Sequence, residues 1–336
     1  MPRAAQRARR FTLEWFKACA RSRTQAHLPD AGNHAPLISA NEIAALAGQA
    51  SLLAHLPVRE VHDHHAGDWA SRWLGRGLDF EESRVYSPGD DTRDMDWRTT
   101  ARTGRPHLKI YREERQPAVH LVVDRGATMR FGTRKRLKVT QAARVAAILA
   151  FAATGQNGVV GATLWSREDE TLPARHGRLA ALGLIDQAGA PCPPPTYLEP
   201  TDPAPTDALR QTDRLAMLEE SLPRGARLVL ISDFAWLRAE HESSLAQLAS
   251  RFDVWAIQIV DAAEQVLPAM GLVRFHDMAS RQDVWLDTAQ ASVRTACQAA
   301  FARRLDAQSA SLARAGIHHQ RILSEADDLV AQLAHG

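Results

Sequence analysis

The stretch "PAVHLVVD", residues 117–124, decides the expected fold. An apolar run rich in β-branched residues ends abruptly in a charge at Asp124. Such a run is typical of a strand that is buried on both faces, as in a parallel sheet. The alanine-rich segment "RKRLKVTQAARVAAILAFAATG", residues 134–155, follows and is closed by Gly155, so it predicts a helix.

Further strands and helices are expected to alternate along the chain. Strand-like runs are "GVVGATLW" (158–165), "RLVLISDF" (227–234) and "DVWAIQIVD" (253–261). Helical segments are expected at 176–189, 207–222 and 241–252. Alternation of this kind predicts an α/β fold with a mostly parallel sheet flanked by helices.

The rest of the chain is assigned to smaller parts around this domain. The expected organisation is an N-terminal helical and linker region (1–66), a small β-rich module (67–118), the α/β domain (119–288) and C-terminal helices (289–336). Residues 41–56 look helical. Seven prolines in residues 188–206 rule out a helix or a central strand there, so we expect an exposed excursion.

Composition narrows the classes of partner and the compartment. The net charge of +2 gives no global field for nucleic acid or an anionic membrane. The sequence has no run of 18 consecutive apolar residues, so we expect no integral membrane segment. The three cysteines show no CxxC spacing, which favours a reducing cytoplasm. The basic start, residues 1–23, resembles a transit peptide, a surface helix or an ordinary solvated helix. The run "TRKRLK" (133–138) is interpreted as a solvated helix start.

Two predicted strands end in an aspartate, Asp124 and Asp233. Open α/β sheets bind ligands at the carboxyl ends of their strands. Thr128 lies four residues after Asp124, and oxygen ligands of this kind suit Mg²⁺. The set is incomplete, because Gly126 stands where a second hydroxyl is needed. The alternative is that Asp124 caps the turn that follows it.

A second candidate is the acidic and basic stretch "SPGDDTRDMDWRTTAR", residues 87–102. It lacks the glycine and the final glutamate of an EF-hand loop. Arginines among the aspartates favour bidentate pairs that fix irregular backbone, so a structural clasp is expected. A partner-binding surface and an acid–base site remain open. The residues assigned to the clasp or partner surface are Arg84, Tyr86, Asp90, Asp91, Arg93, Asp96, Trp97 and Arg102.

Several separate motifs in order give a family resemblance. Residues 75–124 carry a glycine, an aromatic and Glu, then "RVYSPGDDTRDMDW", "AR" and a Glu before the first strand, and "LPARHGRLAAL", "ISDF" and "VDAAEQVLPAMG" follow. This pattern resembles family fifty-eight of the domains of unknown function, over about residues 70–290. The resemblance implies a von Willebrand factor A-like domain. Asp124, Thr128 and Asp233 would then be a degenerate metal-ion-dependent adhesion site, which would hold Mg²⁺.

The resemblance also implies partners. Proteins of this group are typically associated with MoxR-type AAA+ ATPases, so an adaptor or co-chaperone that helps assemble or mature a client protein is expected, not an enzyme. Arg125 would attract an acidic partner if the metal is absent. The alternative is a metal-dependent hydrolase that uses Asp124 and Asp233 with acids from 90–96. The chain has no Walker A motif.

Overall fold

The computed structural model describes residues 35–53, 78–87, 95–113, 118–155, 157–192, 208–276 and 283–334. The chain divides into two compact units: Met1–Val61 with Pro117–Gly336, and His62–Gln116. Within the described ranges, no helix combines the length and apolar character needed to cross a membrane.

A six-stranded sheet forms the centre of the larger unit, in the order β10-β7-β6-β3-β4-β5. Every neighbouring pair in this order is parallel except β4 and β5. The strands are β3 (Ala118–Asp124), β4 (Val159–Trp165), β5 (Glu170–His176), β6 (Arg227–Ser232), β7 (Asp253–Val260) and β10 (His318–Leu323).

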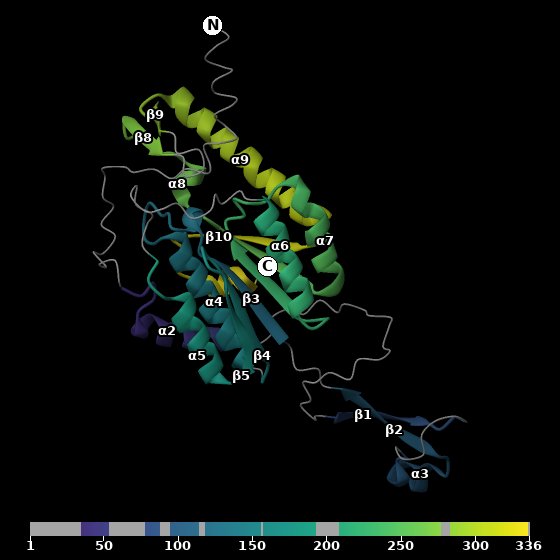
Figure 1. Cartoon of the computed structure of the whole chain (residues 1–336). Helices are drawn as coiled ribbons and strands as arrows, with labels where there is room; N and C mark the ends of the chain where they lie inside the picture. Colours follow the sequence, from purple (N-terminus) through teal and green to yellow (C-terminus); the bar gives the residue numbers. More distant parts are fainter. Residues whose placement is uncertain are drawn as a thin grey trace. The chain divides into compact units, whose positions relative to one another are not determined.

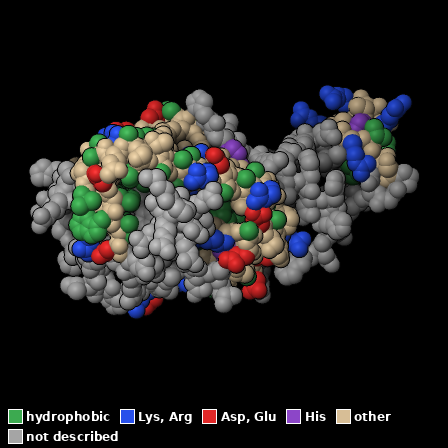
Figure 2. All heavy atoms as spheres, turned by 90° about the horizontal axis from the view of Figure 1, so that it is seen from above, with side chains coloured by type: hydrophobic (Ala, Val, Ile, Leu, Met, Phe, Trp, Pro, Cys, Tyr) green, Lys and Arg blue, Asp and Glu red, His purple; other side chains and the backbone are tan. Residues whose placement is uncertain are grey.

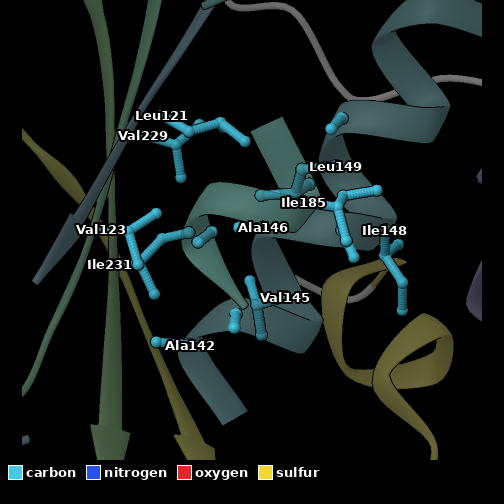
Figure 3. Close-up of a cluster of buried hydrophobic side chains, with 14 of the residues drawn as sticks. Leu121, Val123, Ala142, Val145, Ala146, Ile148, Leu149, Ile185, Val229 and Ile231 are labelled. Carbon is cyan, nitrogen blue, oxygen red and sulfur yellow. The ribbon is translucent and has the colours of Figure 1, made fainter. Parts of the chain in front are cut away.

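Side chains alternate between two cores because successive residues of a strand point to opposite faces. Leu121 and Val123 of β3 belong to the core on one face, and Val122 between them belongs to the core on the other. Figure 3 shows the first of these cores, where Leu121, Val123 and Ile231 point toward the alanine-rich helix α4. The apolar strand runs are therefore explained by helices on both faces.

Helices cover the two faces unequally. The first face carries α4 (Lys138–Gly155), with α2 (Ala40–Ala50), α5 (Arg178–Ala188) and α10 (Leu329–Ala334) in the same core. The second face carries α6 (Ala208–Ser221), α7 (Glu242–Arg251) and part of α9 (Ala291–Arg314). Figure 1 shows these helices around the sheet. Because α4 lies between the sheet and other helices, almost its whole circumference is buried, and its alanines allow close approach.

The predicted α/β architecture is confirmed, with each of the expected strands and helices of 117–261 in place and a helix at 40–50. The C-terminal part differs from the expectation of helices alone. Residues 318–323 form the edge strand β10, which pairs in parallel with β7. The other edge strand, β5, was also not predicted.

A hairpin extends from the carboxyl edge of the sheet. It consists of β8 (Leu272–His276) and β9 (Asp283–Asp287), and the short helix α8 (Ala262–Gln265) connects it to β7. Its inner side chains Val273 and Phe275 share a third core with Val260, at the end of β7, and with α9. Figure 1 shows the hairpin next to α8 and the start of α9.

The smaller unit contains the antiparallel strands β1 (Leu78–Val85) and β2 (His107–Glu113) and the helix α3 (Trp97–Thr103). The smaller unit, His62–Gln116, includes most of the expected β-rich module at 67–118. Gly104 ends α3 in the left-handed conformation, with φ +70°, which glycine adopts without a steric cost.

Candidate functional site

Asp124, the last residue of β3, is buried and accepts two hydrogen bonds. The backbone N–H of Gly126 donates to Oδ1 at 2.9 Å, and the hydroxyl of Ser232 donates to Oδ2 at 2.6 Å. Ser232 Oγ itself accepts the backbone N–H of Phe234 at 3.0 Å and the indole N–H of Trp236 at 3.2 Å. The serine proton must therefore go to Asp124, so this position requires an acceptor. Asp124 therefore caps the turn that follows it, which is the alternative to metal binding given by the sequence.

Asp233, directly after β6, lies at the centre of a buried charge cluster. Its Oδ2 is 2.8 Å from Nζ of Lys138, and the same ammonium is 2.9 Å from Oε1 of Glu264. Its Oδ1 accepts the backbone N–H of Ala235 at 2.9 Å and the hydroxyl of Thr128 at 3.3 Å. Lys138 is 1% exposed. A lysine is almost never buried to this degree unless it is paired.

A third aspartate, Asp261, follows β7 and is fully buried. It accepts hydrogen bonds from the backbone and hydroxyl of Thr133, from the hydroxyl of Ser324 at 2.9 Å and from the backbone of Ala263. Glu264 completes a capping box, because its Oε2 accepts the backbone N–H of Asp261 at 3.0 Å. The other oxygen of Glu264 is then free to accept from Lys138, which links this strand end to Asp233.

The two aspartates of the site differ in acidity. Burial raises the pKa of Asp124 to about 6, the negative charge of Asp233 adds to the rise, and the hydrogen bonds from Ser232 and Gly126 offset part of it. Burial also opposes ionisation of Asp233, but the positive charges of Lys138 and Arg304 outweigh it and leave the pKa of Asp233 below its ordinary value. Asp233 is therefore the anion that the lysine requires.

The structure brings the predicted trio of Asp124, Thr128 and Asp233 to one edge of the sheet. Three participants were missed by sequence reasoning: Lys138, Glu264 and Asp261. Lys138 stands in a basic run that was interpreted as solvated, although Ala142 and Val145 lie four and seven residues later on the same helical face.

Arg125 differs from its expected role as a charge that attracts an acidic partner. Its guanidinium donates to the carbonyl oxygens of Gln187 at 3.1 Å and Ala190 at 2.8 Å, at the C-terminal end of α5. A cation is favourable at this end of a helix, where carbonyl groups lack partners. The side chain of Arg125 therefore holds α5 in place.

The residues present do not fit a Mg²⁺ ion. Mg²⁺ takes oxygen ligands at about 2.0–2.1 Å and keeps several waters. Both oxygens of Asp124 already accept hydrogen bonds. Of the oxygens of Asp233, one accepts hydrogen bonds and the other is paired with the Lys138 ammonium. Among the described residues, no three His, Cys, Asp or Glu side chains are grouped as metal ligands would be.

The segment 87–102 is described only in part. Asp90, Asp91 and Arg93 lie outside the described residues, as do residues 88–94 generally. Asp96 is buried and caps α3: it accepts the backbone N–H of Thr99 at 3.1 Å and hydroxyls of Thr99 and Ser83 at 2.7 and 2.5 Å. Of the other residues assigned there, Arg84, Trp97 and Arg102 are exposed and Tyr86 is half-buried.

We expect Asp96→Ala to lower the free energy of unfolding of the smaller unit by about 1 kcal/mol, the usual cost of losing an N-cap. Asp96 also joins β1 to α3 through Ser83, so protection of amides in α3 against hydrogen exchange should fall as well. Asp96→Asn keeps an acceptor for Thr99 and is the matched control. Unchanged exchange in α3 would show that the cap does not hold this helix.

Comparisons with known proteins give a family. The model of the family described as "Protein of unknown function DUF58" matches residues 82–307. An uncharacterized protein of Mycobacterium bovis and one of Mycobacterium tuberculosis are each 32% identical over 253 residues, which is 74% of this chain and 74% of each relative.

Two solved structures are also similar. One is the conserved hypothetical protein BatB from Bacteroides thetaiotaomicron, at 12% identity and a TM-score of 0.34, covering 60% of this chain and 98% of that one. The other is an aerotolerance-related membrane protein from Bacteroides fragilis, at 14% identity and a TM-score of 0.39, covering 65% of this chain and 96% of that one.

Proposed function

The chain belongs to the family described as "Protein of unknown function DUF58", and from this membership we propose that it is a protein-interaction module of the cytoplasm. In the finer form of the proposal it is an adaptor or co-chaperone of a MoxR-type AAA+ ATPase, and it helps to assemble or mature a client protein.

One observation carries the proposal: the strand-end carboxylates are engaged within the fold. Asp124 is held by Ser232 and Gly126, and Asp233 is held by Lys138. Acid–base or nucleophilic work requires a group that can reach the proton or atom on which it acts. Side chains this buried and this fully bonded instead stabilise a rigid edge of the sheet, on which loops and the hairpin can present a binding surface.

The surface that we assign to the partner is the outer face of the hairpin β8–β9. Trp285 is opposite Arg274 in the register, and Leu272 lies two residues before Arg274, so these side chains share one face. Trp285 is 58% exposed and Leu272 is 65% exposed. Tryptophan and arginine are among the side chains enriched at binding hot spots. The partner of Arg274 in an ion pair, Asp283, lies on the same face.

This face of the larger unit does not favour a strongly charged partner. Figure 2 looks down on the molecule from the top of Figure 1, and it shows acidic, basic and hydrophobic side chains interspersed over the described part of the larger unit. A mixed surface of this kind fits a protein partner better than nucleic acid, which requires a continuous basic patch.

Affinity purification of the tagged chain from its own cells, with ATP and Mg²⁺ present, tests the proposal. We expect the wild type and Leu179→Ala to retain a MoxR-type AAA+ ATPase, identified by mass spectrometry. The amount of ATPase retained by Trp285→Ala should be at least tenfold lower. Leu179 is the matched control, because it is exposed on α5 and not on the hairpin. Retention by all three proteins would place the interface elsewhere, and retention by none would contradict the proposed partner.

The alternative of a hydrolase rests on one observation. The pKa of Asp124 is raised to about 6 while that of Asp233 is lowered, and carboxyl pairs with separated pKa values occur in acid–base sites. The same separation of pKa values arises wherever one carboxylate of a buried pair is paired with a lysine and the other is not. The alternative gains weight if no ATPase is retained.

A further inference from the structure

We propose that the ammonium group of Lys138 takes the place of the divalent cation that the resemblance to an adhesion site implies, so that this edge of the sheet carries its cation as part of the chain. The inference concerns the cation alone, and it holds whether or not a AAA+ partner is found.

The first argument is the position of the ammonium. Nζ of Lys138 lies 2.8 Å from Asp233 and 2.9 Å from Glu264, and it is also 5.7 Å from the centre of the Phe131 ring. Two carboxylates and an aromatic face therefore surround one positive charge. Asp233 follows β6, and Glu264 lies in α8, the short helix after the neighbouring parallel strand β7; Lys138 is the first residue of α4. A cation that ties strand ends together would occupy this location.

The second argument is that the lysine stands where local preference opposes it. A positive side chain in the first turn of a helix meets the positive end of the helix dipole, which is unfavourable. Its nearly complete burial adds a desolvation cost. Neither cost is offset by the helix itself. The compensation must come from Asp233 and Glu264, so the lysine and these carboxylates form one unit.

The third argument is the balance of charge. Asp233 and Glu264 carry two negative charges in contact with the one positive charge of Lys138, and Arg304 acts on Asp233 as a second positive charge. A divalent ion added to this group would lie close to the ammonium, and like charges repel strongly in a buried site. If the ammonium is removed, two buried carboxylates face each other across the space that it leaves, and Asp124 contributes a third negative charge nearby. Such a site attracts a cation from solution.

The first experiment titrates the wild-type chain with MgCl₂ and MnCl₂ in a calorimeter, with NaCl at matched ionic strength as the control. We expect no saturable heat up to millimolar concentrations of either salt. Saturable binding of Mg²⁺ that Asp233→Asn abolishes would overturn the proposal. This measurement needs no variant that removes the lysine, so it decides the question even if such variants do not fold.

The second experiment asks whether the site becomes a metal site without the lysine. We expect Lys138→Ala to gain at least tenfold in Mn²⁺ affinity over the wild type and to melt at a higher temperature when Mg²⁺ is added. Lys138→Met, which fills the space with an uncharged chain, should gain much less. A folded Lys138→Ala variant that binds Mn²⁺ no better than the wild type would contradict the exchange of an ammonium for a metal ion.

Discussion

Replacing Asp233 by asparagine is expected to lower the free energy of unfolding by about 3–5 kcal/mol, as measured by urea denaturation at pH 7. Breaking a buried ion pair by removing one partner leaves the other charge uncompensated, and losses of this size are usual. Here the charge left behind is the ammonium of Lys138, which would lose one of its two carboxylate contacts and keep that to Glu264. The amide of asparagine would also point a donor at a group that only donates.

A double variant is the control for this prediction. Asp233→Asn combined with Lys138→Met removes both charges, and buried ion pairs replaced by uncharged groups of similar volume often cost little. We therefore expect the double variant to be more stable than Asp233→Asn alone, with a coupling of at least about 1.5 kcal/mol in the double-mutant cycle. A loss below about 1 kcal/mol in the single variant would mean that the ammonium reaches water and that the pair contributes little.

The central strands could be predicted from the sequence because their environment leaves a simple signal. A strand between two helical layers is apolar at every position, and the run in β3 is buried along nearly its whole length. The same holds for β6, of which each residue is buried. Helices such as α7 were predictable for a related reason, since their buried residues, Leu245 and Leu248, recur with the helical period. Helix α4 is buried almost all round, and its alanine-rich composition was the signal.

The edge strands could not be predicted in this way. Edge strand β5 reads "ETLPARH", with exposed residues along most of its length and a proline at 173. Proline is confined to edge strands because it cannot donate to the ladder, and it also protects an edge from pairing with another chain. Strand β10, "HHQRIL", has one fully buried residue, Ile322. Neither run alternates cleanly or is continuously apolar, so only the tertiary structure identifies it.

The site was predicted in two of its carboxylates, Asp124 and Asp233, and not in its cation. Asp124 and Asp233 end strands that are neighbours in a parallel sheet, so their ends must meet at one edge. Asp261 follows from the same rule, because β7 is the next neighbour of β6. Lys138 was hidden by the basic residues around it: Arg134 and Lys135 are more than half exposed, while Lys138 is buried. Local composition does not distinguish them; the structure does, because Arg134 and Lys135 precede α4 whereas Lys138 is its first residue.

The pH dependence of stability provides the second large effect. The free energy of unfolding of the wild type, minus that of Asp124→Asn, is expected to fall by about 3 kcal/mol as the pH rises from about 3 to about 7. The pKa of Asp124 is 3.8 in the unfolded chain and about 6 in the folded chain, mainly because of burial. Between these values the folded chain keeps a proton that the unfolded chain has released. The stability due to this proton is complete below pH 3.8 and is lost as the pH rises through about 6.

A second buried group, His120, titrates in nearly the same pH window, and its effect on stability has the opposite sign. It therefore serves as the control. Burial lowers the pKa of His120 from 6.5 to about 4, so its contribution is present above pH 6.5 and is lost as the pH falls through about 4. The difference between the wild type and His120→Gln should therefore rise with pH where the Asp124 difference falls. Asparagine at 124 also places a donor against Ser232, whose oxygen already accepts two N–H groups, but that cost is the same at every pH. A flat Asp124 difference would mean that water reaches the strand ends, and the site would then be open to ligands.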